Sequence, residues 1–141
     1  MSQYEYRAWL MLLGLGPAYT LYFALQAIEP GWVTTVQQRL LCLAAAAVTH
    51  ALVCLAGLAL KRPGADEKNT ADERDRAIDA RATRGAYFLL MTGAVVVGMV
   101  MPFNQSGWKI VNAALFSIVL AEVLRNALIV RGYRGRARFA H

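Results

Sequence analysis

Four long apolar runs dominate this sequence, and they constrain its fold more than any other feature. They lie at about residues 8–28, 38–60, 85–101 and 108–130. Each is close to the roughly 20 residues that an α-helix needs to cross the hydrocarbon core of a bilayer. The helices of a soluble bundle would carry polar faces, and these runs have almost none. The sequence therefore predicts an all-α fold, an integral membrane four-helix bundle that forms one domain over residues 1–141.

The composition supports the same fold class. Only 17% of the residues are charged, whereas a soluble domain has about 25%. Cys42 and Cys54 lie in one apolar run, about 18 Å apart on a straight helix, which is too far for a disulfide.

The N-terminal residues lack a cleavable signal pattern, so we expect the first span to be retained. Residues 14–17, Gly-Leu-Gly-Pro, interrupt that span and predict a kink.

The uneven distribution of basic residues predicts the orientation of the chain. With four spans, both termini and the long polar loop at 61–84 lie on one side of the membrane. That side carries seven basic residues in the loop and four arginines in the C-terminal tail. The opposite side has only Arg39 and Lys109. The positive-inside rule therefore places both termini and the loop in the cytoplasm.

The polar loop predicts a helix that begins outside the membrane. Residues 70–73, Thr-Ala-Asp-Glu, fit a capping box. Nothing stops a helix before Pro102, so we expect it to run unbroken from about Ala71 into the third span. The loop holds seven basic and six acidic residues, a balance that favours self-pairing, with the chain's own basic tail as the partner, or recognition of a soluble protein over binding to nucleic acid. The alternative is a merely solvated juxtamembrane helix.

We interpret residues 71–84 as a cytoplasmic docking helix and the tail as a basic segment at the lipid headgroups. The candidate docking residues are Asp72, Glu73, Arg74, Asp75, Arg76, Asp79 and Arg81. The candidate lipid-facing residues of the tail are Arg131, Arg134, Arg136 and Arg138.

Two ionisable residues lie within the spans at matching depth. His50 in the second span and Glu122 in the fourth are each roughly 18–20 Å from the outer end of their run. Ionisable groups at such depth are costly and usually face a partner, so we predict a His50–Glu122 hydrogen bond. Arg125 is the rival partner for Glu122. A polar cluster around the pair would include Tyr19, Thr49, Asn112, Arg125 and Asn126. The pair would either fix helix register or form part of a proton or ion path.

The residue types exclude most catalytic and metal chemistry. His50 and Cys54 are four residues apart on one helix face, but structural zinc needs three or four protein ligands and no others are near. A haem between spans typically needs a pair of axial ligands. No Ser-His-Asp order, phosphate-binding glycine loop or HExxH motif occurs. We therefore expect no cofactor, no metal and no enzymatic activity.

The segment Asp72–Ile78 reads DERDRAI and is followed by Ala80-Arg81-Ala82 and by Tyr87 at the start of a span. This pattern resembles the DER-type cytoplasmic motif of the DUF2178-like family of small four-span prokaryotic membrane proteins of unknown function. The resemblance covers residues 72–90 in detail and the remainder only by span count. The alanine-rich second span and the arginine-rich tail depart from it. It implies a multi-pass protein of a bacterial or archaeal inner membrane that holds or releases a transcription factor, and it implies no catalytic residues.

The sequence thus favours a non-enzymatic inner-membrane interaction or regulatory protein. Its expected partners are the lipid bilayer and a cytoplasmic regulatory protein, without direct contact to nucleic acid. One alternative is a small proton- or ion-coupled transporter that uses His50 and Glu122. Another is an accessory subunit of a larger membrane complex, or a homo-oligomer. Stripes of small residues would suit that packing, at Ala94 and Gly98 and at Ala113, Ser117 and Ala121.

Overall fold

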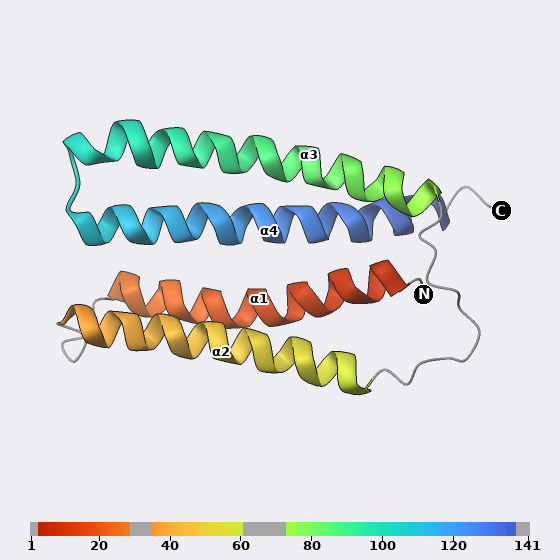
Figure 1. Cartoon of the computed structure of the whole chain (residues 1–141), viewed down its shortest axis with the longest axis horizontal. Coiled ribbons are helices and arrows are strands. Elements are labelled where there is room, and N and C mark those ends of the chain that lie inside the picture. The colour runs from red at the N-terminus through yellow and green to blue at the C-terminus, as the bar shows by residue number, and fades with distance from the viewer. Residues whose placement is uncertain (1–2, 29–34, 61–72, 138–141) are drawn as a thin grey trace. The chain divides into compact units, whose positions relative to one another are not determined.

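The computed structural model describes residues 3–28, 35–60 and 73–137, with side chains at 4–28, 35–60 and 73–134. This part of the chain is almost entirely helical (Figure 1). Its long helices are α1 (Gln3–Ile28), α2 (Val36–Leu60), α3 (Glu73–Val95) and α4 (Gly107–Ala137). All four helices are long and apolar enough to cross a membrane. The predicted fold class, all-α with four apolar helices, is therefore confirmed.

The helix that was predicted to enter the third span without a break does so. α3 begins at Glu73 and continues through the apolar residues to Val95. The predicted capping box at 70–73 lies mostly outside the described residues. α4 likewise continues past Val130, the predicted end of its span, as far as Ala137. Both helices therefore extend beyond the apolar run at the same end of the α3–α4 hairpin.

A capping box that we did not predict begins α2. The Thr35 backbone N–H donates to Gln38 Oε1 at 3.1 Å, and the Gln38 N–H donates to Thr35 Oγ1 at 3.3 Å. This reciprocal pair satisfies two donors that the first helical turn leaves free. The sequence Thr-Val-Gln-Gln at residues 35–38 carries the signal. It sets the start of α2 at Val36, slightly before the predicted start of the second span.

The two prolines within spans have different consequences. α1 runs as one helix through Pro17, so the predicted interruption does not end it. Near Pro102, α3 gives way to a π-helical turn, η1 (Val96–Val100), and a 3₁₀ turn, η2 (Met101–Phe103). The Met101 N–H donates to the carbonyl of Val96, as in a π-helix. Pro102 explains this change, because it has no N–H and its ring crowds the carbonyl of Gly98.

The chain divides into two compact units. One contains α3, η1, η2, α4 and the start of α1 up to Ala8; the other contains α1 from Trp9 together with α2. Whether both act as one domain stays a prediction. In the second unit, α1 and α2 meet through glycines. A Cβ at Gly14 would lie 2.7 Å from His50 Cδ2, and one at Gly57 would clash with the Leu10 side chain.

Small residues also set the spacing of α3 and α4, which lie side by side and antiparallel (Figure 1). Gly93 faces Ser117, Gly85 faces Leu128, and Gly132 faces Ile78. Within lipid no hydrophobic effect drives apolar helices together, so close packing at small residues has to hold them. Ser117 belongs to a predicted small-residue stripe. Ala94 of α3 and Gly98 of η1, predicted as another, do not contribute to the contact with α4.

This packing predicts that a larger side chain at Gly93 separates the hairpin. A Cβ there would lie 2.6 Å from Ser117 Cβ, whereas a Cβ at Gly98 would meet nothing within 4 Å. We expect Gly93→Val to destabilise the detergent-solubilised protein by about 1–3 kcal/mol, measured as a lower midpoint of thermal unfolding by circular dichroism. Gly98→Val, the matched control, should melt close to the parent. Equal effects of the two substitutions would contradict the α3–α4 contact described.

Candidate functional site

The polar extension of the α3–α4 hairpin gathers most of the charged residues that the structure describes. We call it the charged end and define it as residues 73–84 of α3 and 125–134 of α4. The antiparallel contact brings these two segments together, since Ile78 lies against Gly132 at its centre. The charged end contains every candidate docking residue except Asp72, and it contains Arg131 and Arg134 of the tail. Asp72 and Arg138 lie outside the described residues, as does the side chain of Arg136.

An ion pair ties the two helices together at the start of the apolar run. Arg125 Nη2 donates to Asp79 Oδ1 at 2.9 Å, and Arg125 Nε donates to Thr83 Oγ1 at 3.3 Å. Each charged side chain remains 38% exposed, so solvent screening keeps the stabilisation modest, at about 0.2–1 kcal/mol. Arg125 reaches from within the apolar run of α4 towards the polar start of α3. A long cationic side chain near a membrane edge extends in this way to keep its charge out of lipid.

A second polar contact lies one helical turn farther out. The Tyr133 hydroxyl donates to Asp75 Oδ1. Asp75 and Asp79 are four residues apart, so they share the face of α3 that is turned towards α4. Two of the candidate docking residues are thus engaged within the chain itself. Their role in the structure is to hold the charged end of α3 against α4.

The remaining charges of α3 point elsewhere and fall on two further faces. At 100° per residue, Glu73, Arg76, Ala80 and Arg84 share one side, which we call the outer face. All four are exposed. Arg74 and Arg81, seven residues apart, share the next side together with Ala77 and Ile78. α3 therefore presents an acidic face to α4, a mixed but mainly basic outer face, and a basic and apolar third face.

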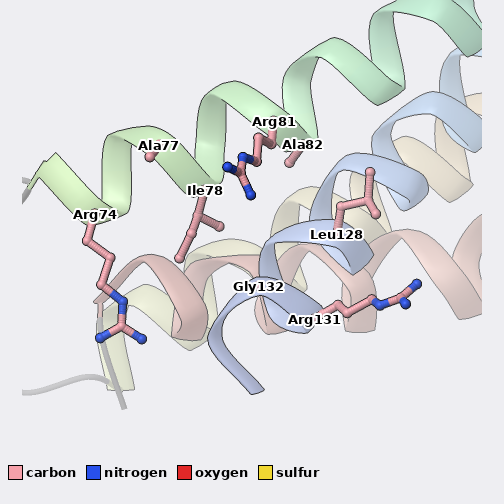
Figure 2. A pocket seen from close by; sticks show the side chains of 8 residues that line it. All are labelled: Arg74, Ala77, Ile78, Arg81, Ala82, Leu128, Arg131 and Gly132. Carbon is pink, nitrogen blue, oxygen red and sulfur yellow. The ribbon is translucent and has the colours of Figure 1, made fainter. Parts of the chain in front are cut away.

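The third face forms one side of a groove between α3 and α4 (Figure 2). The groove has a volume of about 390 Å³. Its lining residues are Arg74, Ala77, Ile78, Arg81, Ala82, Leu128, Arg131 and Gly132. Three arginines and no carboxylate of the described residues line it. Within the part of the chain that the structure describes, none of the three arginines has an ion-pair partner.

His50 lies in the other unit, between α2 and α1. Its ring meets that of Tyr19 edge to face, with centroids 6.1 Å apart, and it packs against Gly14. The Nε2 atom is buried and has no hydrogen-bond partner among the described residues. Glu122 is exposed on α4. Because the predicted His50–Glu122 hydrogen bond would join the two units, it stays a prediction.

The other members of the predicted polar cluster mostly have partners close by. The Thr49 hydroxyl donates to the Ala45 carbonyl at 2.8 Å. Asn126 is buried, and its Nδ2 donates to the Glu122 carbonyl at 2.8 Å. Asn112 is half-buried on α4 and also has an interaction partner. Arg125 is paired with Asp79 as described above.

His50 and Cys54 are the two residues that were considered as metal ligands. The Cys54 thiol contacts the Met11 sulfur at 3.8 Å, one turn along α2 from His50. Over the described ranges, no three His, Cys, Asp or Glu side chains come together as metal ligands would. Cys54, Met11 and the His50 ring lie at the contact between α1 and α2, and the Nε2 atom of His50 is buried there.

The groove is the feature that the sequence reasoning missed. Arg74 and Arg81 were interpreted as members of a continuous docking helix, and Arg131 as part of a tail. The seven-residue spacing of Arg74 and Arg81, with Ala77 and Ile78 between them, carries a signal for one basic and apolar helix face. Gly132 gave no signal alone, because its role depends on which residue of α3 it meets.

Comparison with known proteins yields no relative from which a function could be taken. No protein-family model matches the chain, and neither a curated protein nor a solved structure is significantly similar to it.

The geometry of the charged end predicts a specific disulfide. A Cβ at Gly132 would lie 3.7 Å from the Cβ of Ile78, within the range that disulfides require. With Cys42 and Cys54 replaced by serine, we expect Ile78→Cys with Gly132→Cys to cross-link on mild oxidation. The two thiols then become unreactive towards a maleimide-polyethylene glycol on a gel.

The matched control pairs Gly132→Cys with Ala80→Cys, because Ala80 lies on the outer face. Those two thiols should stay reactive after the same oxidation. Cross-linking of both pairs to the same extent, or of neither, would contradict the packing of α3 on α4 at the charged end.

Proposed function

We propose that this chain is a non-enzymatic interaction or regulatory protein of a prokaryotic inner membrane, which docks a cytoplasmic partner protein on the outer face of α3. One observation carries the proposal. The charged segment of α3 is a continuous helix with its transmembrane part, and it is held against α4 by Asp75 and Asp79. The outer face is therefore presented in a fixed position relative to the membrane.

The charge of that face defines the chemistry of the partner. The loop as a whole is nearly balanced, but Asp75 and Asp79 are engaged by α4. Among the described residues of the outer face, Arg76 and Arg84 remain against the single carboxylate of Glu73. The partner accordingly carries acidic side chains opposite Arg76 and Arg84. Charge complementarity of this kind mainly sets association rate and specificity.

The positive-inside distribution of basic residues supports a cytoplasmic position for this face. The resemblance of residues 72–90 to the four-span prokaryotic family supports an inner membrane and a regulatory partner. Of the family-like motif, Glu73, Arg76 and Ala80 lie on the outer face of α3. A soluble regulator that is held at the membrane would bind to a helix whose orientation is fixed by its continuity with the span.

Site-specific photo-cross-linking tests the docking face. A photoreactive amino acid at Ala80, in the centre of the outer face, should give an adduct with a soluble protein in native membranes. Arg76→Glu with Arg84→Glu should abolish that adduct, because reversal of both charges repels an acidic partner. The same probe at Val111, exposed in the apolar run of α4, is the matched control and should give no soluble adduct.

Absence of any adduct from Ala80, or its persistence in the charge-reversal variant, would contradict the docking proposal. Substitution of Asp75 and Asp79 would be a poor test. Those carboxylates bind Tyr133 and Arg125, so their loss would also loosen the hairpin.

A second candidate function is a proton- or ion-coupled transporter. The observation that favours it is the buried Nε2 of His50, which has no hydrogen-bond partner among the described residues. A buried imidazole without a partner is either a structural cost or a group that binds something in another state. Glu122, the ionisable residue predicted at matching depth in the fourth span, would complete such a path.

We expect the His50 side chain to be structural. His50→Gln should lower the midpoint of thermal unfolding, because it removes the ring contact with Tyr19, and both His50→Gln and Glu122→Gln should leave proton flux into reconstituted vesicles at the level of the parent. Thr49→Val, whose hydroxyl only bonds to its own helix, is the control for a neighbouring polar change. A change in flux with unaltered thermal stability would favour the transporter instead.

A further inference from the structure

The groove at the charged end lies where the polar and apolar parts of the hairpin meet. Arg81 lies four residues before Gly85, the start of the apolar run of α3, which is about 6 Å along the helix. Arg131 directly follows Val130, the last residue of the apolar run of α4. Leu128 and Ala82 lie on the apolar side of these two arginines. In a membrane, this position is that of the lipid headgroups.

The groove is lined by both cationic and apolar side chains, so its ligand should carry both an anionic and an apolar group. Arg74 and Arg81 from α3 and Arg131 from α4 are exposed cations (Figure 2). A guanidinium presents several N–H donors in a planar fork that matches phosphate oxygens. The rest of the lining is apolar or small: Ala77, Ile78, Ala82, Leu128 and Gly132. A free phosphate ion would not pack against these apolar residues, whereas the glycerol and first methylene groups of a phospholipid would.

The two aspartates of α3 that the structure describes are hydrogen-bonded to side chains of α4. Asp79 is paired with Arg125, and Asp75 accepts from Tyr133. Neither carboxylate lines the groove. The positive charge of its three arginines is therefore available to a ligand.

We propose that this groove binds one anionic phospholipid. Figure 2 shows the guanidinium groups of Arg81 and Arg131 pointing apart, so both side chains turn towards each other to hold its phosphate at the membrane edge. Arg74, about 10 Å farther out along α3, faces the outer part of the headgroup. Ile78 and Leu128 contact the glycerol and the start of the acyl chains. The lipid thereby bridges α3 and α4 beside the Asp79–Arg125 pair. The proposal is independent of the docking function, because it uses a different face of α3.

Native mass spectrometry of the full chain in neutral detergent tests this site. With added phosphatidylglycerol, we expect one lipid to be retained per chain, and phosphatidylcholine to be retained far less. The triple variant Arg74→Gln, Arg81→Gln and Arg131→Gln should bind phosphatidylglycerol at least about tenfold more weakly, since it loses its charge-assisted hydrogen bonds. The control variant Arg7→Gln, Arg76→Gln and Arg84→Gln removes the same charge from exposed positions outside the groove and should bind like the parent.

A steric variant keeps the test independent of charge. Ala77 is exposed and lines the groove, so Ala77→Trp should fill it while all three arginines remain, and should also displace the lipid. Correct folding of each variant is established by its helical circular dichroism and by formation of the 78–132 disulfide in the cysteine background.

Three results would overturn the proposal. Equal weakening in the groove and control triples would mean that only net charge attracts the lipid. Equal retention of phosphatidylcholine would remove the selectivity for an anionic headgroup. Displacement of phosphatidylglycerol by water-soluble glycerophosphate at a similar concentration would show that the site binds phosphate without contacts to the apolar residues of the groove.

Discussion

The close contact between α3 and α4 is the interaction on which the rest of this unit depends. In lipid, two apolar helices gain little from hiding apolar surface, so they need to pack closely to stay together. Gly93, Gly85 and Gly132 provide that proximity at three levels of the hairpin. The antiparallel register that results then determines which polar residues meet beyond the membrane. Arg125 reaches Asp79 and Tyr133 reaches Asp75 because these glycines fix the distance between the two helices.

A membrane also explains why the charged segment of α3 is helical. A backbone within hydrocarbon has to satisfy its own hydrogen bonds, which makes the apolar part of α3 a stable helix. A helix that already exists is extended at small cost, since nucleation is the unfavourable step. The polar residues from Glu73 to Arg84 therefore continue a helix that the membrane has imposed. Their faces are fixed by this continuity, and α4 then covers one of them.

The fold could be predicted from the sequence because span length and hydrophobicity are local properties. The four apolar runs follow from hydrophobicity, and the continuation of the third towards Glu73 follows from the lack of a helix-breaking residue before Pro102. The π-helical turn before Pro102 was missed, although the proline that explains it was visible. The groove could not be predicted, because it depends on the register between Ile78 and Gly132, which are far apart in the sequence. For the same reason, Asp75 and Asp79 were interpreted as docking residues until Tyr133 and Arg125 were found beside them. The His50–Glu122 pair remains a prediction, since it depends on how two separate units meet.

The acidic and basic side chains of the loop are separated onto different surfaces only when α3 packs against α4. As a peptide, residues 61–84 would carry seven basic and six acidic side chains that largely compensate one another. Packing separates them, because α4 contributes one cation and one hydroxyl group to the two aspartates that face it. Arg74 and Arg81 are then left beside Arg131, and Arg76 and Arg84 are left on the outer face. A basic surface thus arises from an almost neutral segment through its contact with a second helix. The isolated segment would lack that surface, since Leu128, Arg131 and Gly132 of the groove and both partners of the aspartates belong to α4.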